Sequence, residues 1–125
     1  MIGLFLVMLG GALGAGARHL TGRLTLALLG PGYPWGTLTV NLAGGLLMGL
    51  LVGTLARLEV PGENWRLFLG VGILGGFTTF SSFALDAVVM IERGDAGAAI
   101  GYALVSLIGS VLAVFAGLAA VRAMV

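Results

Sequence analysis

Four long apolar stretches, joined by short connections, restrict the fold of this chain more than any other feature. They run over about residues 2–20, 35–56, 65–91 and 96–121. As a helix, a stretch of about 20 residues crosses a hydrocarbon core of ~30 Å. Only 9% of the residues are charged, whereas about a quarter are charged in a soluble domain. The sequence therefore predicts an all-α membrane protein, with residues 1–125 forming one integral membrane domain of four transmembrane helices.

The first apolar stretch has no basic segment before it and is followed by three others. We therefore expect it to be kept as a span rather than cleaved as a signal peptide, in a multi-pass protein of the cell inner (plasma) membrane. The chain has no cysteine, which excludes disulfides and thiolate metal sites. A net charge of +1 without a basic run gives no reason to expect a nucleic-acid partner.

The six arginines are divided evenly between the two sides of the predicted membrane domain. Three lie on the side of the termini and three on the opposite side: Arg57, Arg66 and Arg122, and Arg18, Arg23 and Arg93. An excess of basic residues near span ends normally sets the orientation of a membrane protein. The even count is a physical reason to consider dual topology, in which copies insert in both orientations and meet antiparallel. A small count can also come out even by chance, or the N-terminal amine can decide the orientation.

Glycines recur four residues apart in every predicted span, a spacing that lets helices approach closely. The sets are Gly10 and Gly14; Gly45, Gly49 and Gly53; Gly72 and Gly76; Gly97 and Gly101. We interpret them as packing positions.

Asn41 lies in the second span, in the segment GTLTVNLAGG. A carboxamide in hydrocarbon needs partners, because burying it unpaired is costly. It forms either an interhelical hydrogen bond, typically worth ~1 kcal/mol or less, or an uncharged donor lining a polar path. The sequence alone leaves both roles open.

Three hydroxyl groups in the fourth span have helical spacing: Tyr102, Ser106 and Ser110. Residues four apart share one helix face. Serines can satisfy themselves on carbonyls of their own helix, but a stripe through half a span favours a hydrated track.

Arg18 ends the first predicted span and is followed by His19. The guanidinium either extends to the headgroups or maintains a positive potential at a pore mouth, which would favour anions. We interpret His19 as an interfacial residue.

The segment GGFTTFSSF, residues 75–83, predicts that the third span is broken near 75–79. Backbone groups exposed by such a break are tolerated in a membrane only when they are buried in protein or line a cavity. Phe80 and Phe83, three residues apart, would share a face after the break. The ring edge of phenylalanine carries the positive part of its quadrupole, so two edges can face a small anion without a fixed charge. By residue type alone, however, ordinary packing is the more common role of such rings.

The groups that are missing narrow the function further. No carboxylate lies in the middle of a span, and Asp86 is the nearest to the predicted break. Small four-span exporters driven by protons use a buried glutamate in the first span, which is missing here. One histidine and no cysteine provide neither a metal cluster nor a nucleophile–base pair, so no enzyme is predicted. The groups that remain are uncharged donors, ring edges and an arginine at one end, and these are suited to a passive path for a small anion.

The segments GGALGAGARH (10–19), GTLTVNLAGG (36–45) and GGFTTFSSF (75–83) resemble, in this order, the motifs of the Fluc, or CrcB, fluoride channel family. The similarity covers the whole chain in length, number of spans and order of motifs. It implies an antiparallel, dual-topology homodimer that exports fluoride passively through two pores, with a sodium ion at the centre of the interface.

The resemblance also implies roles for single residues. Those that match the family's fluoride path are Phe80, Phe83, Asn41, Tyr102, Ser106, Ser110 and Arg18, and the hydroxyl of Thr79 is counted with them. The backbone carbonyls of Gly75 and Thr78 match the structural sodium site, where the glycine would let the chain turn.

Three residues depart from the family pattern. His19, Ser82 and Asp86 stand where tyrosine, threonine and glutamate are common. The shorter side chain of Asp86 leaves its role in a vestibule open.

We therefore expect a dimeric, fluoride-selective channel that lowers cytoplasmic fluoride, with sodium as its only cofactor. Two alternatives remain. A fluoride–proton antiporter would need a titratable group in the pore, for which Asp86 is a weak candidate, and a structural subunit of a larger membrane complex would carry no flux.

Overall fold

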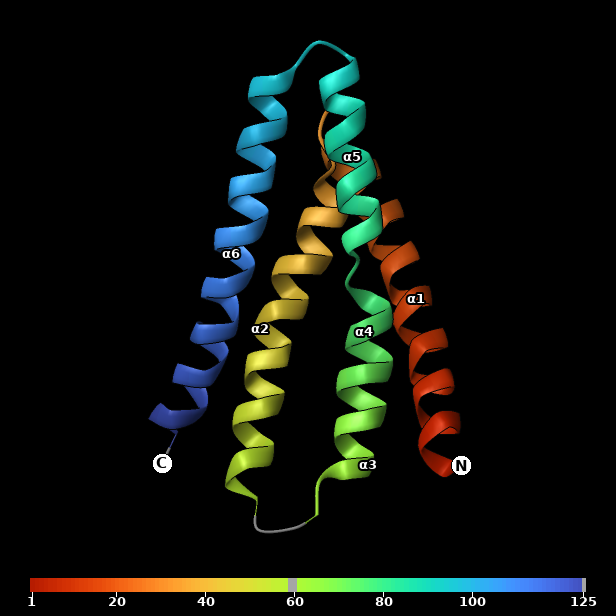
Figure 1. Ribbon diagram of the computed structural model, residues 1–125, viewed down its shortest axis with the longest axis vertical. Helices are drawn as coiled ribbons and strands as arrows, with labels where there is room; N and C mark the ends of the chain where they lie inside the picture. Colours follow the sequence, from red (N-terminus) through yellow and green to blue (C-terminus); the bar gives the residue numbers. More distant parts are fainter. Residues whose placement is uncertain (59–60, 125) are drawn as a thin grey trace.

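The computed structural model describes residues 1–58 and 61–124, and within these the chain is entirely helical apart from turns and short links (Figure 1). Helices α1 (Ile2–Leu29), α2 (Trp35–Arg57) and α6 (Ala96–Ala123) are continuous. The remaining span consists of α3 (Glu63–Trp65), the π-helix η1 (Arg66–Leu74), α4 (Gly75–Phe77) and α5 (Phe80–Glu92). Both termini lie at the same end of the bundle as α3.

Four segments are long and apolar enough to cross a membrane: Ile2–Leu29, Trp35–Arg57, Glu63–Glu92 and Ala96–Ala123. This confirms the prediction of an all-helical, multi-pass membrane protein.

Helices α1 and α5 end where glycine permits a sharp change of direction. Gly30 and Gly94 have φ angles of 79° and 81°, a region that residues with a Cβ rarely adopt. Asp95 then begins α6, because its carboxylate accepts a hydrogen bond from the Ala98 N–H at 3.3 Å. Helix α1 continues past Leu20, where we expected its span to end, because the helix-forming residues 24–29 precede the first Gly–Pro pair.

Glycines bring two pairs of helices into backbone contact. The most extensive contacts join α2 to α6 and α1 to η1. A Cβ added at Gly10 or Gly14 would overlap backbone of the third span, and one at Gly49 would overlap backbone of α6. By contrast, a Cβ at Gly97 or Gly101 would meet nothing within 4 Å in the protomer. The glycine spacing therefore marks close packing in the first three spans, but not at these two positions of the fourth.

Few side chains are buried within one protomer. A small cluster between α2, α5 and α6 contains Leu38, Met90, Ala99 and Tyr102. Large aliphatic and aromatic side chains on all four spans are exposed. Such a surface fits contact with lipid or with another subunit.

Candidate functional site

The third span is interrupted between α4 and α5. Thr78 (φ −84°, ψ 159°) and Thr79 (φ −154°, ψ 124°) have extended backbones. The span becomes helical again as α5, and the Thr79 hydroxyl caps this helix by accepting a hydrogen bond from the Ser82 N–H at 3.2 Å. The predicted break is present, but the expected turn at Gly75 is not: Gly75 is helical, with φ −63° and ψ −38°. The two threonines, rather than the glycine, carry the change of direction.

Asn41 on α2 replaces the hydrogen bonds that the interrupted backbone of Thr79 lacks. Its Nδ2 donates to the Thr79 carbonyl oxygen at 2.9 Å, and the Thr79 N–H donates to its Oδ1 at 2.8 Å. In a continuous helix, this N–H would bond to the carbonyl of Gly75 instead. The interhelical hydrogen bond, one of the two roles left open by the sequence, is therefore present. Since a carboxamide nitrogen has two N–H groups, a second donor remains on Nδ2.

Arg18 lies inside α1, not at the end of this helix as we expected. Its Nε donates to the carbonyl oxygen of Gly76 at 3.1 Å, and its side chain is partly buried. The guanidinium is therefore held beside the break rather than extending to the lipid headgroups.

A groove of about 430 Å³ runs between α2, the break, α5 and α6. Six of the residues predicted for the fluoride path line it: Asn41, Thr79, Phe80, Phe83, Ser106 and Ser110. Within the described part of the chain, the buried Ser106 hydroxyl has no hydrogen-bonding partner. The groove thus combines neutral polar atoms and aromatic rings, with no charged side chain in its lining.

The two phenylalanines at the groove differ in exposure within a protomer. Phe80 is 80% exposed, whereas Phe83 packs against the buried Tyr102, with ring centroids 5.1 Å apart. The two phenylalanine rings are 5.6 Å apart and tilted by 45°. They form one aromatic edge along the groove.

Tyr102 does not line the groove, although it has helical spacing with the two serines that do. Its hydroxyl donates to Oδ2 of Asp86 at 3.0 Å, and it is not among the residues lining the groove. The predicted stripe is therefore split: Ser106 and Ser110 line the groove, and Tyr102 packs behind Phe83 and orients Asp86.

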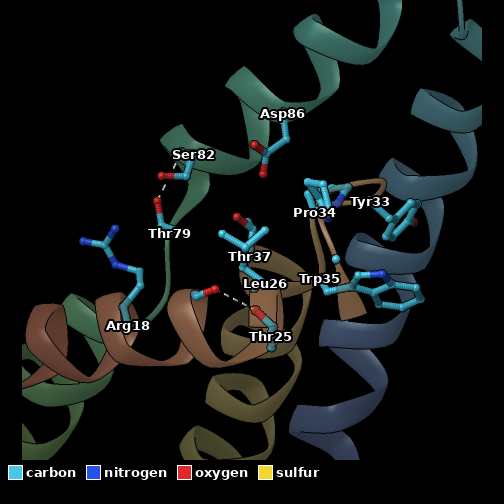
Figure 2. Close-up of a pocket in the computed structure, with 14 residues that line it drawn as sticks. Arg18, Thr25, Leu26, Tyr33, Pro34, Trp35, Thr37, Thr79, Ser82 and Asp86 are labelled. Atoms are coloured by element: carbon cyan, nitrogen blue, oxygen red, sulfur yellow. Dashed lines mark hydrogen bonds between the residues drawn. The ribbon is translucent and has the colours of Figure 1, made fainter. Parts of the chain in front are cut away.

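A second cavity, of about 310 Å³, lies between α1, the start of α2 and α5, beside the break (Figure 2). Tyr33, from the loop before α2, and Trp35, at the start of α2, contribute to its lining. The other polar residues that line it are Arg18, Thr25, Thr37, Thr79, Ser82 and Asp86. Thr79 lines both the groove and this cavity. Thr25 and Trp35 were not predicted as functional residues. Thr37, one turn before Asn41 in the sequence, is the signal that marks this face of α2 as polar.

The described residues contain no group of three or more His, Cys, Asp or Glu side chains that could hold a metal ion. Gly75 and Thr78 are the residues whose backbone carbonyls the family resemblance assigns to a cation. Gly75 is exposed in the protomer, and the Thr78 hydroxyl is engaged by the Leu74 carbonyl at 2.9 Å.

Comparison with known proteins identifies the family. The profile described as "CrcB-like protein, Camphor Resistance (CrcB)" matches residues 5–118. A Sphingopyxis alaskensis protein named "Fluoride-specific ion channel FluC" is 55% identical over 122 residues, covering 98% of this chain and 97% of the relative. Proteins with the same name from Mesorhizobium japonicum and Caulobacter vibrioides are 52% identical over 118 residues (94% of each chain) and 49% identical over 120 residues (95% and 94%). With this extent of similarity, the chain belongs to the CrcB family of membrane proteins.

Proposed function

We propose that this chain is the subunit of a passive, fluoride-selective ion channel that lowers cytoplasmic fluoride. The groove between α2, the break and α6 supports this most directly, because it gathers neutral donors and ring edges without a charged side chain. The relatives, which are named fluoride-specific ion channels, support the same conclusion. A channel of this kind is not an enzyme, and the chemistry it needs is the transfer of an ion out of water.

Fluoride is small and strongly hydrated, so a path through the membrane has to replace its water with other donors. In our proposal these are the second N–H of Asn41, the hydroxyls of Thr79, Ser106 and Ser110, and the edges of Phe80 and Phe83. Neutral donors in a low-dielectric site stabilise an anion, but they do not trap it as a buried counter-ion would. Conduction requires binding that is favourable enough for entry and weak enough for exit.

We propose further that the conducting unit is a homodimer. In a single protomer the groove is open rather than enclosed, and Phe80 is 80% exposed. Polar groups in contact with hydrocarbon are costly, so a path lined by Asn41 and Ser110 needs a cover. A second copy, inserted in the opposite orientation as the even arginine count favours, would supply this cover and give two equivalent paths.

A structural sodium ion fits the carbonyl groups at the break. The Thr79 N–H bonds to Asn41, which leaves the Gly75 carbonyl without the donor that a continuous helix would supply. Gly75 is also exposed, and neutral oxygen ligands suit a hard monovalent cation. Gly75 and Thr78 of each protomer would hold the ion, which would supply positive charge between the two breaks. Replacing sodium with a large organic cation is expected to weaken the dimer or its activity.

The function is tested by reconstituting the purified chain into liposomes loaded with potassium fluoride and following efflux with a fluoride electrode. With a potassium ionophore present, we expect rapid fluoride release without a pH gradient, and retention of chloride in matched vesicles. Release that stops when protons cannot exchange would identify an antiporter instead. Vesicles that hold fluoride as tightly as protein-free ones would refute transport by this chain.

A further inference from the structure

Arg18 donates a hydrogen bond to the carboxyl end of α4, the first half of the broken span. We infer that the channel needs Arg18 for this positioning role, and not for a positive charge at a pore mouth. The inference rests on the proposed function, because it concerns how the break is kept in its conducting form.

The break removes helical donors from the carbonyl groups at the end of α4. In a continuous helix, the Gly76 carbonyl would accept a hydrogen bond from the Phe80 N–H, but the two residues before Phe80 are extended. The Arg18 Nε–H donates to this carbonyl instead, at 3.1 Å. Helix C-termini carry partial negative charge, so a guanidinium N–H is a strong donor for this position. Arg18 therefore caps α4 from a neighbouring helix.

The packing of α1 places Arg18 at this carbonyl. Gly14 lies one turn earlier on the same helix face, and a Cβ there would overlap the backbone at Ile73 and Phe77. A Cβ at Gly76 would lie 2.6 Å from the Gly11 carbonyl oxygen. Small residues thus hold α1 against α4, and the next turn presents a long side chain where the third span turns away.

The break is consequently held at both ends by side chains from two different helices. Asn41 of α2 binds Thr79 on one side, and Arg18 of α1 binds Gly76 on the other. The proposed cation ligands, Gly75 and Thr78, belong to this short segment. Without the bond to Arg18, we expect the carbonyls of residues 75–78 to lose their fixed direction.

Three substitutions separate the donor of Arg18 from its charge. Arg18→Gln places an N–H donor as many bonds from Cα as Nε, without a charge. Arg18→Met places a methyl group there and has no donor. Arg18→Lys keeps the charge but carries its ammonium group one bond further out. The two neutral variants are combined with Arg122→Gln so that the arginine count stays even, and Arg23→Gln with Arg122→Gln is the matched control, because Arg23 and Arg122 are exposed.

Fluoride efflux and amide hydrogen exchange over residues 75–83 are measured for each variant. We expect Arg18→Gln to conduct like the control and Arg18→Met to conduct about ten- to a hundredfold more slowly, the range expected for a lost hydrogen bond to a charged group. Exchange over residues 75–83 should rise in the Met variant only, with exchange over residues 100–115 unchanged.

Two results would overturn the inference. A Gln variant as impaired as Met, with an active Lys variant, would show that the charge is what matters. A Met variant with unchanged efflux and exchange would show that the bond has no role. If the Met variant cannot be recovered as a folded protein, the efflux rates of the Gln and Lys variants still distinguish the donor from the charge. If the unmodified chain conducts no fluoride, the proposed function fails, and the exchange measurement still tests the cap.

Discussion

The carboxamide of Asn41 combines two tasks in one residue. Its Oδ1 and one Nδ2 hydrogen complete the backbone hydrogen bonds of Thr79, and the same side chain lines the groove. A neutral amide is suited to this because it can accept and donate at once. An ionised aspartate at this position could accept from the Thr79 N–H but could not donate to the Thr79 carbonyl.

Replacing Asn41 should therefore damage both stability and flux. Asn41→Ala loses two hydrogen bonds, each worth about 1 kcal/mol, so we expect the free energy of unfolding to fall by about 2 kcal/mol and fluoride efflux to be lost. Asn41→Asp keeps the acceptor for the Thr79 N–H, but places an anion against the Thr79 carbonyl, and should be no better in efflux. Thr21→Ala is the control, because the Thr21 hydroxyl bonds within its own helix. Thermal unfolding in detergent measures the first effect; an Asn41→Ala protein as stable as the control would contradict it.

The aromatic edge of the groove makes a separate prediction. Phe80→Ile and Phe83→Ile keep apolar bulk but remove the positive ring edge, so we expect each to slow fluoride efflux by at least about tenfold, or ~1.4 kcal/mol in the barrier. The dimer should remain intact by cross-linking. Phe115→Ile is the matched control, since Phe115 is exposed and lies outside the groove. Equal efflux from all three variants would reduce the two rings to packing residues.

Motifs and spacing predicted most of the groove, but not the partners of single side chains. Asn41 could be found because a carboxamide is unusual in a span, the two serines because of their helical spacing, and Phe80 and Phe83 because they belong to the motif GGFTTFSSF. Helical spacing assigned Tyr102 to the same stripe, since it cannot show that an acceptor on α5 draws the hydroxyl away. Arg18 was expected at a helix end because a charge normally ends an apolar run. The carbonyl to which it donates belongs to Gly76, 58 residues away in sequence, and spacing along the chain does not reveal this contact.

At the scale of elements, the third span is the exception to regular helical structure. Its interruption was predictable because glycine and threonine are poor helix formers in the middle of a span. The π-helical segment Arg66–Leu74 was not, since nothing in its composition distinguishes it from an α-helix. This segment packs against α1, where Gly10 and Gly72 bring the two backbones together.

Alanine substitutions test whether glycine packing supports the break. The methyl group of Gly14→Ala would overlap backbone atoms of the third span, and that of Gly49→Ala would overlap backbone atoms of α6. Overpacking of this kind costs about 1–3 kcal/mol, so both variants should unfold at lower temperature. Gly97→Ala has open space in the protomer and should match the unmodified chain in monomer stability. A Gly14→Ala protein that melts with the unmodified one would argue against the close packing of α1.

At the scale of the whole molecule, the open groove and the even arginine count lead to the same arrangement. In the proposed dimer a second copy in the opposite orientation covers the groove, and a chain without charge bias can insert in both orientations. The arginine count left this arrangement open and the family resemblance implied it, and the open groove adds a separate argument for the proposal.

Two complementary variants make dual topology testable. Arg23→Gln and Arg122→Gln remove exposed charges from opposite sides, so each should shift insertion toward one orientation, and the shifts should be opposite. We expect each variant alone to show reduced fluoride efflux and a C-terminal tag labelled mainly from one side. Expressed together, they should restore efflux to the level of the unmodified chain. A tag labelled from a single side in the unmodified protein would rule out dual topology.

The position of the break also has an electrical consequence. Helix α5, with 13 residues, is about 20 Å long, so the break divides the third span near its middle. A monovalent ion held there would cross about half of the transmembrane voltage from either side, or ~1.2 kcal/mol per 100 mV. Its occupancy would therefore respond to voltage with equal steepness from both faces of the membrane.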